Sequence, residues 1–485
     1  MGLLDSYSIS FDHFIGGERV ASERSFDDIS PIDGSVIAQV SAGGRHEAYL
    51  AITAAEKGFE IWSRTKRSER AAIMRTIATL IEERVEVLAM VETIDNGSLL
   101  RSHLRSVMPR VAHNFRFFAQ FLEEGLDYPD FETRGHKNHV SYDPSGPSLL
   151  ISPWNAPLML ETWKIAPALA AGNSVVLKPS EWSPLTASIL ADITKDAGLP
   201  DGVFNVVQGI GEEVGPHLVG DHRIARISFT GSVPTAKAIA SLAAKNLTPC
   251  SFELGGKSPF IVFGDADLDL AVKLAIDQFD NAGQVCLSGT RLLIEDDIFD
   301  QFIDRFTIAQ SQLRQGDPRA DLADIGPQIH PEHLDRIDRF VQRAKANGSK
   351  LIFGGERNLD LGGLYYRPTL FVEDRIDTEI FQEEIFGPVL VAKAFSGVQE
   401  AIAIANSTKF GLAGVVVTSS REVAERVSSE VVAGTIWNNC FFVRDLSAPF
   451  GGSKSSGVGR EGGHWSFDFF CDVKNSVFAP TGWAS

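Results

Sequence analysis

Cysteine is scarce in this chain of 485 residues: there are only four, Cys250, Cys286, Cys440 and Cys471. Four cysteines are too few to stabilise a protein of this size through disulfide bonds, and no two of them form the Cys-X-X-Cys pair that is typical of zinc sites. The sequence therefore excludes a disulfide scaffold and predicts no metal site. It suits a reducing compartment, and we expect a cytoplasmic protein.

Positive charge and long apolar runs are also in short supply. Lys and Arg number 45 against 63 Asp and Glu, which gives a formal net charge of −18. An acidic chain repels the phosphates of nucleic acids and anionic lipids, so we expect neither nucleic acid nor membrane as a partner. The most apolar region, residues 148–178, contains Asn155, Glu161 and Lys164, which argues against a membrane span.

What the sequence does contain is a repeated alternation of strands and helices. Apolar residues recur at three- and four-residue intervals in 46–61, 66–92 and 98–124, which predicts helices there. Alternating strands and helices begin at residue 148 and again near residue 258, which predicts an α/β fold with two parallel-sheet domains. The predicted strands are 148–151, 174–177, 203–207, 226–229, 258–263, 389–391 and 414–417, and the helices are 160–171, 184–197, 233–245, 297–315, 331–347 and 398–406.

Two helix starts indicate a phosphate-bearing ligand. Gly209, Gly211 and Gly215 form a GxGxxxG turn between a strand and a helix, and Ser232 is placed to cap the helix after the next strand. Backbone N–H groups at such starts bind anions, although a glycine-rich turn alone is structurally ordinary. Glu181, after another strand, can accept both hydroxyls of an adenosine ribose and would repel a 2′-phosphate, which favours NAD over NADP. Lys178 can bind the same ribose; a solvated Lys–Glu turn is the alternative.

Three residues are candidates for the chemistry. Cys286 follows a Gly-Gln-Val sequence, and its thiolate would attack an aldehyde well, helped by a helix end or neighbouring donors that lower its pKa. Glu253 precedes a flexible di-glycine and can act as a base, unless it pairs with Lys257. Asn155 can donate to a developing alkoxide, which is worth about 3–4 kcal/mol, or merely cap a helix. Taken alone, Cys286 would be a buried core residue.

The order of these motifs is more specific than any one of them. The series, in chain order, is Pro-Trp-Asn at 153–155, Lys-Pro-Ser-Glu at 178–181, the glycine turn at 209–215, Phe-Thr-Gly-Ser at 229–232, Glu-Leu-Gly-Gly-Lys-Ser-Pro at 253–259, Gly-Gln-Val-Cys at 283–286, Glu-Glu-Ile-Phe-Gly-Pro-Val at 383–389 and Pro-Phe-Gly-Gly-Ser-Lys-Ser-Ser-Gly at 449–457. This series resembles the aldehyde dehydrogenase superfamily, from about residue 15 to the C-terminus.

The resemblance implies a role for each matching residue. Cys286 is implied as the nucleophile, Glu253 as the general base, and Asn155 with the Cys286 N–H as the oxyanion hole. The aldehyde would be oxidised through a thiohemiacetal and a thioester, with NAD as hydride acceptor. Glu461 matches a position with a proton-relay role. The residues implied to bind NAD are Ile151, Trp154, Lys178, Glu181, Gly211, Ser232, Leu254, Glu384 and Phe386.

A closer resemblance concerns the substrate pocket. Residues 108–118, 439–446 and 460–463 are similar to the branch of 2-hydroxymuconic, 5-carboxymethyl-2-hydroxymuconic and 2-aminomuconic semialdehyde dehydrogenases of aromatic catabolism. In that branch two arginines hold the substrate's far carboxylate, and Arg110 and Arg444 match them here. A helix-surface ion pair is the alternative for Arg110. Trp163 and Phe450 are candidates for the apolar walls. An aromatic aldehyde of the benzaldehyde or vanillin type is the alternative substrate.

The resemblance also implies the domain plan. Residues 1–121 and 145–254 would form the NAD domain, and 255–452 the catalytic domain, both of Rossmann type. The polar segment 122–144 and the strand-like tail within 453–485 would form a small β-arm that joins a homodimer or homotetramer. Three other functions compete: a catalytically silent binding protein, a CoA-acylating dehydrogenase and an NADPH-dependent reductase. The presence of Cys286, Glu253 and Asn155 argues against the first, Glu253 against the second and Glu181 against the third.

Overall fold

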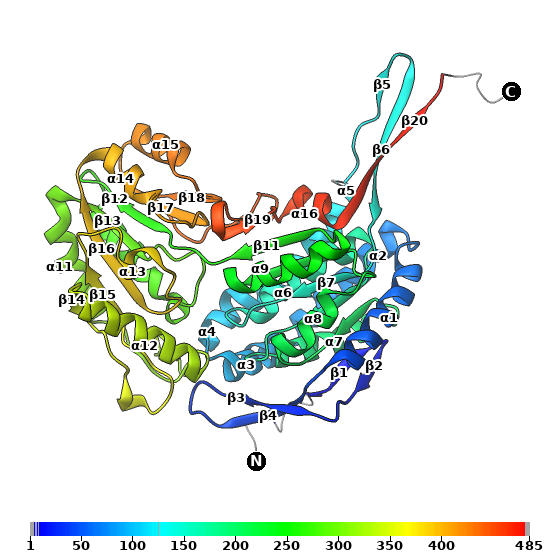
Figure 1. Cartoon of the computed structure of the whole chain (residues 1–485), viewed down its shortest axis with the longest axis horizontal. Helices are drawn as coiled ribbons and strands as arrows, with labels where there is room; N and C mark the ends of the chain where they lie inside the picture. Colours follow the sequence, from blue (N-terminus) through cyan, green and yellow to red (C-terminus); the bar gives the residue numbers. More distant parts are fainter. Residues whose placement is uncertain (1–3, 5–6, 8, 125, 481–485) are drawn as a thin grey trace.

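Two large mixed sheets form the body of the protein (Figure 1). This computed structural model describes residues 4, 7, 9–124 and 126–480. The first sheet has eight strands in the order β19-β11-β10-β7-β8-β9-β1-β2, in which the five from β11 to β9 are parallel. Its strands are β1 (His13–Ile15), β2 (Glu18–Val20), β7 (Ser148–Ile151), β8 (Val175–Lys178), β9 (Phe204–Val206), β10 (Arg226–Gly231), β11 (Cys250–Leu254) and β19 (Gly457–Val458), and the helices that connect the parallel strands are α6 (Pro157–Ala171), α7 (Leu185–Asp196), α8 (Gly211–Val219) and α9 (Val233–Ala243).

The second sheet has seven strands in the order β14-β15-β16-β13-β12-β17-β18, all parallel except β14. Its strands are β12 (Pro259–Val262), β13 (Arg291–Glu295), β14 (Lys350–Phe353), β15 (Thr369–Val372), β16 (Val389–Phe395), β17 (Ala413–Val417) and β18 (Thr435–Asn438), and its helices are α10 (Leu268–Ile276), α11 (Phe299–Gln310), α12 (Pro331–Ala346), α13 (Glu379–Gln382), α14 (Gly397–Ala405) and α15 (Arg421–Glu430). The predicted α/β fold with two parallel-sheet units is therefore confirmed.

The strand register brings the expected cofactor residues to one edge. Ile151 pairs with Lys178 at the ends of β7 and β8, and Gly231 pairs with Leu254 at the ends of β10 and β11. The inner strands are almost completely buried, which is why their sequences are continuously apolar rather than alternating. In open parallel sheets ligands bind beyond the carboxyl ends of the strands, and that edge faces the second sheet here (Figure 1).

Three predicted helices differ from the observed ones. The helix predicted at 66–92 is two helices, α2 (Arg67–Glu83) and α3 (Val85–Asn96), because Arg84 leaves helical geometry (φ −112°, ψ 15°). The helix predicted at 98–124 begins as α4 (Leu100–Ser102), passes through a π-helical turn at His103–Val107 and continues as α5 (Met108–Glu124). The helix predicted at 297–315 ends at Gln310, where the chain turns. Helix α1 (Arg45–Trp62) agrees with its prediction.

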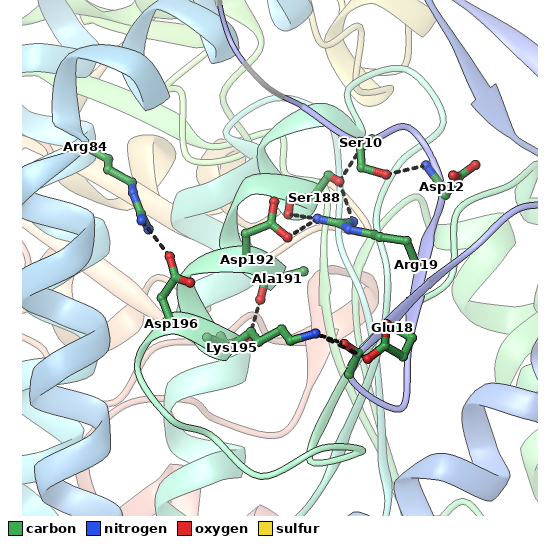
Figure 2. A network of polar contacts seen from close by, with 12 residues as sticks. Ser10, Asp12, Glu18, Arg19, Arg84, Ser188, Ala191, Asp192, Lys195 and Asp196 are labelled. Atoms are coloured by element: carbon green, nitrogen blue, oxygen red, sulfur yellow. Dashed lines mark hydrogen bonds and ion pairs between the residues drawn. The ribbon is translucent and has the colours of Figure 1, made fainter.

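Two arginines, Arg19 and Arg84, form polar contacts with residues of α7 (Figure 2). Arg19 on β2 donates to the Ser188 hydroxyl (2.8 Å) and carbonyl (3.0 Å) and pairs with Asp192 (2.5 Å). Arg84, at the break between α2 and α3, pairs with Asp196 at the other end of α7 (2.6 Å). The hairpin β1–β2 and the helical break are thus both anchored on one helix of the first sheet.

A three-stranded sheet projects from the body (Figure 1). It consists of β5 (Phe131–Thr133), β6 (His136–Pro144) and β20 (Cys471–Phe478), with β20 antiparallel to β6 along its whole length. The predicted hairpin and final strand are confirmed; residues 125 and 481–485 of the predicted arm lie outside the described residues.

Between β6 and β20 in the chain, β19 joins the first sheet and α16 (Gly463–Phe470) packs on α6. A two-stranded hairpin, β3 (Ser25–Ile29) and β4 (Val36–Ser41), completes the fold. Among the described helices, none has the length and apolarity needed to cross a membrane.

Gly58 tests the packing of α1 against the first sheet. A Cβ at this position would lie 2.3 Å from the Gly202 carbonyl carbon. The substitution Gly58→Ala therefore pushes α1 away from the backbone at Gly202, although alanine is the better helix former. We expect the free energy of unfolding to fall by about 2 kcal/mol. Calorimetry should show a lower Tm than for Lys57→Ala, an exposed neighbour on the same helix. A Gly58→Ala protein as stable as that control would refute the close approach.

Candidate active site

The loop that carries Cys286 is held in an unusual backbone conformation. Asn281, Ala282 and Gly283 have positive φ angles of 49°, 55° and 75° in succession. Gly283 has no alternative, since a Cβ there would lie 2.2 Å from the Gly387 carbonyl oxygen. Non-glycine residues rarely adopt this geometry, and such strain gathers at functional sites. The turn sets the direction in which the following residues, including Cys286, leave the loop.

Asn155 is tied to this loop by two hydrogen bonds. Its Nδ2 donates to the Gln284 carbonyl (2.9 Å), and Asn281 Nδ2 donates to the Asn155 carbonyl (2.8 Å). Helix α6 is capped by Ala156 without a side-chain bond, so the helix-cap alternative for Asn155 is wrong. An amide nitrogen has two N–H groups, and one remains for a ligand. Asn281 was missed in the sequence, because a single asparagine two residues before a glycine gives no signal of its own.

Glu253 is a buried carboxyl group with no partner. It lies on β11, is 5% exposed, and neither of its oxygens has a hydrogen-bond partner in the described part of the chain. Burial, together with the nearby carboxylate of Glu461, raises the pKa of Glu253 well above its usual value. The predicted alternative, an ion pair with Lys257, does not form between these residues. A free carboxyl group at this depth is suited to proton transfer.

The thiol of Cys286 is the main correction to the sequence prediction. Burial and the carboxylates of Glu384 and Glu253 raise the pKa of Cys286 to about 12, although Arg444 acts in the opposite direction. We expected a lowered pKa from a helix end or neighbouring donors. The prediction was wrong because Cys286 lies in a turn rather than at a helix end, and because two acids from distant segments face it. Arg444 is therefore the charge that favours the thiolate.

The two predicted arginines meet at one aromatic ring. The guanidinium carbon of Arg110 lies 5.5 Å from the centre of the Trp163 ring, and that of Arg444 lies 5.0 Å from it and 3.7 Å from the centre of Phe450. Arg444 Nη2 is buried without a hydrogen-bond partner. Burial lowers the pKa of both arginines, that of Arg110 to about 10 with Arg444 as the next cause. Within the described chain neither pairs with a carboxylate, so the surface ion pair considered for Arg110 is absent.

Glu461 holds Trp163 and Lys164, two neighbouring residues of α6. Its carboxylate accepts from the Trp163 indole N–H (2.6 Å) and from Lys164 Nζ (2.7 Å). The Ser228 hydroxyl donates to the same oxygen as Lys164 (3.2 Å). Trp163 and Phe450 are both buried, and the Arg444 guanidinium group lies against both rings. Their role as apolar walls of a substrate pocket stays a prediction.

On the first sheet, three of the expected cofactor residues contact one another. Lys178 Nζ donates to the Glu181 carboxylate (2.6 Å), and the Gly211 N–H, which opens α8, donates to its other oxygen (3.4 Å). Burial opposes the charged form of Glu181, yet Lys178 and these hydrogen bonds lower its pKa overall. Because Lys178 is 3% exposed, the alternative of a solvated turn is wrong. Ser232 caps α9, with its Oγ accepting from the Thr235 N–H (3.2 Å).

Residues that precede β16 of the second sheet contact the loops that follow β7 and β11 of the first sheet. Glu384 accepts from the Gly256 N–H (3.1 Å), and burial raises its pKa to about 7. Phe386, at φ 61°, lies edge-on to Trp154 with ring centres 5.2 Å apart. Two residues of α12 that we did not predict hold this loop: Arg336 donates to the Glu384 carbonyl (2.7 Å) and His333 to the Phe386 carbonyl (2.7 Å). Their three-residue spacing places them on one helix face, which is the signal that could have found them.

The reactivity of Cys286 should follow its environment. With a pKa near 12 the thiolate fraction rises about tenfold for each pH unit from about pH 7 to 9, so alkylation by iodoacetamide should accelerate without a plateau. Arg444→Met removes the favourable charge and should slow alkylation about three- to tenfold at each pH. Arg110→Met is the control, because Arg110 does not act on the thiol. A plateau below pH 9, measured against a Cys286→Ala background, would contradict the raised pKa.

The sequence matches the profile of the aldehyde dehydrogenase family over residues 19–476. It is 40% identical over 478 residues to the 2-hydroxymuconic semialdehyde dehydrogenase of Pseudomonas sp. (strain CF600), an alignment that covers 96% of this chain and 98% of the relative. The expected resemblance to this branch is thereby confirmed.

Solved structures agree with the sequence match. HpcC from Thermus thermophilus superimposes with a TM-score of 0.94 at 43% identity, covering 96% of this chain and 92% of the other. Betaine aldehyde dehydrogenase from Staphylococcus aureus, in complex with NAD+, gives a TM-score of 0.94 at 36% identity over 99% of this chain and 97% of the other. With the order of the motifs and the geometry of the candidate site, these matches lead to one conclusion: the chain belongs to the aldehyde dehydrogenase family.

Proposed function

We propose that the protein catalyses the NAD-dependent oxidation of an aldehyde that carries a distal carboxylate, a semialdehyde of the hydroxymuconic class. The observation that carries this proposal is the pair Arg110 and Arg444, which lie against one indole ring and form no salt bridge with the described residues, Arg444 also acting on the Cys286 thiol. Unpaired guanidinium groups are costly to bury, and a planar carboxylate relieves that cost by bidentate hydrogen bonding. The 40% identity to a hydroxymuconic semialdehyde dehydrogenase supports the same substrate class.

The residues that follow β8, β9 and β10 fit NAD. Glu181, held by Lys178 and the Gly211 N–H, presents a carboxylate to a ribose diol, and its charge disfavours a 2′-phosphate. The starts of α8 and α9, with the Ser232 hydroxyl, suit a diphosphate. When bound, NAD supplies the acceptor for the hydride. The residues proposed to hold it are Ile151, Trp154, Lys178, Glu181, Gly211, Ser232, Leu254, Glu384 and Phe386.

Cys286 begins the reaction by adding to the aldehyde carbon. The thiol first loses its proton, a step favoured by Arg444 and by a proton acceptor such as Glu253. The new C–S bond leaves negative charge on the former carbonyl oxygen. We assign the stabilisation of this alkoxide to the Cys286 backbone N–H and to the free N–H of Asn155, whose orientation is fixed by its bond to Gln284.

Glu253 completes the reaction by activating water. Once the carbon is oxidised, the acyl group is a thioester on Cys286, and Glu253 takes a proton from the attacking water. The water oxygen bonds to the acyl carbon, the C–S bond breaks, and the acid leaves with the Cys286 thiolate restored. Because the Glu253 carboxyl group makes no hydrogen bond in the described chain, it can turn toward either the thiol or the water.

We also propose that the protein assembles as a homodimer or homotetramer through its β-arm. One edge of β20 pairs with β6, and Val473, Val477 and Phe478 on this strand are about half exposed. An open edge strand with apolar side chains is a template for strand addition by another copy. The division into an NAD domain, 1–121 and 145–254, and a catalytic domain, 255–452, is proposed on the same resemblance, with 453–470 packed against the first sheet.

The substrate class is tested by comparing a carboxylated with a neutral aldehyde. Arg110→Ala and Arg444→Ala should each lower the ratio of kcat/KM for 2-hydroxymuconic semialdehyde over benzaldehyde about a hundredfold, because a buried charge loses its partner. The ratio cancels any effect of Arg444 on the thiol. Arg116→Ala, on the same helix as Arg110 but paired with Glu82, should change nothing.

If the wild type prefers benzaldehyde and the ratio does not move, the substrate class fails and an aromatic aldehyde takes its place. Cys286→Ala should abolish oxidation of both aldehydes. Turnover in that variant would exclude the thioester route, whichever aldehyde is preferred.

The cofactor preference is tested at Glu181. Glu181→Gln removes the negative charge that faces the ribose, so KM for NAD should rise about tenfold and the preference for NAD over NADP should fall at least as much. Glu212→Gln, an exposed carboxylate beside Gly211, is the matched control. Initial rates with each cofactor at saturating aldehyde measure the change. Equal preference in wild type and Glu181→Gln would place the ribose elsewhere.

A further inference from the structure

We propose that Asn114 is a positioning residue that sets the preference for carboxylated aldehydes by orienting the guanidinium group of Arg110. This inference rests on the proposed function, because it assigns a role to a residue behind the arginine that receives the substrate's carboxylate. Asn114 touches neither Cys286 nor the cofactor cleft, and it acts on the reaction only through Arg110.

Asn114 is fully buried one helical turn after Arg110 on α5. Its Oδ1 accepts a hydrogen bond from Arg110 Nε at 2.9 Å. Residues four apart on a helix lie on the same face, so this contact follows directly from their spacing. Asn114 is therefore the one neutral acceptor that holds the Arg110 head group among the described residues.

The other end of the Asn114 amide is anchored on α6. Nδ2 donates to the Thr162 hydroxyl (3.0 Å) and to the Met159 carbonyl (3.3 Å). A flipped amide would point its oxygen at the Met159 carbonyl and its N–H groups at the Arg110 N–H, so both of these contacts would become repulsive. Only one orientation of the amide is compatible with its surroundings, so Oδ1 always faces Arg110.

This arrangement determines which edge of Arg110 remains for a ligand. A guanidinium group has five N–H donors in one plane, and Asn114 occupies the donor on Nε. The two terminal nitrogens make no hydrogen bond with the described residues and form the edge that matches a carboxylate in a bidentate pair. Holding the plane in advance removes part of the entropy cost of fixing a long side chain when substrate binds.

The anchor is needed because the two arginines repel each other. Burial and the charge of Arg444 both lower the pKa of Arg110, whereas Asp445, an exposed carboxylate, acts in the opposite direction. A released Arg110 side chain would turn away from Arg444 and toward solvent and Asp445. Asn114 holds it beside Trp163, the ring that the Arg444 guanidinium group also contacts.

Replacing the amide by an apolar side chain of similar shape tests the idea. In Asn114→Leu we expect KM for 2-hydroxymuconic semialdehyde to rise about tenfold, with kcat changed by less than about twofold and the kinetics of benzaldehyde unaffected. Thr162→Val is the matched control, because it removes one anchor on α6 but leaves the Met159 carbonyl and the bond to Arg110. It should retain the wild-type preference.

A double-mutant cycle separates positioning from general support of the helix. If Asn114 acts only through Arg110, Asn114→Leu should cause no further loss of preference in an Arg110→Ala protein. Equal losses for both aldehydes, or losses that add to those of Arg110→Ala, would overturn the positioning role. They would leave the proposed substrate class intact, which fails only if Arg110→Ala itself keeps the preference.

Should Asn114→Leu fail to fold, Asn114→Asp provides a second test. The aspartate keeps the shape and the acceptor, but its charge would pair with Arg110 and compete with the substrate's carboxylate. The loss for 2-hydroxymuconic semialdehyde should then exceed that of Asn114→Leu, about a hundredfold in KM, with benzaldehyde again unaffected. An Asn114→Asp enzyme that binds the carboxylated aldehyde as well as wild type would refute the proposal.

Discussion

The geometry of the proposed active site depends on the pair of hydrogen bonds that joins the Asn155 loop to the Cys286 loop. One loop leaves the first sheet and the other leads into the second, so the bonds from Asn155 to Gln284 and from Asn281 to Asn155 fix the proposed nucleophile relative to the proposed oxyanion donor across two structural units. The positive φ angles of the Cys286 loop are tolerated because these bonds over-determine it. Neither sheet alone could place both groups.

Burial is the second constraint, and it acts on charge. Glu253, Glu384 and Cys286 are all driven toward their neutral forms by desolvation, whereas Arg110 and Arg444 keep their positive charge because the pKa of arginine starts so high. Burial therefore weakens the negative charge around Cys286 while the two guanidinium groups stay charged, within a strongly acidic protein. The anionic substrate that we propose would be attracted by these two groups, whereas the acidic surface repels anions in general.

Seven strands of the two sheets and the chain order of the motifs could be predicted from the sequence, because buried parallel strands are continuously apolar. Strands β13, β15 and β18 of the second sheet were not predicted. The break at Arg84 and the π-turn at His103–Val107 could not be predicted, since both depend on packing against distant segments rather than on local propensity. The raised pKa of Cys286 also escaped prediction. It is set by burial and by Glu384 and Glu253, whose approach to the thiol is a property of the folded chain.

The π-turn that precedes α5 has a consequence for the side chains that this helix presents to α6. A π-turn adds one residue to a helix and so rotates everything after it by about 100°. Arg110 and Asn114 face α6 together only in the phase that this extra residue creates. A single-residue deletion in His103–Val107 would remove this extra residue and change the phase of α5 relative to α4. An arginine aligned with Arg110 in another chain therefore faces the same ring only where its helix keeps the same phase.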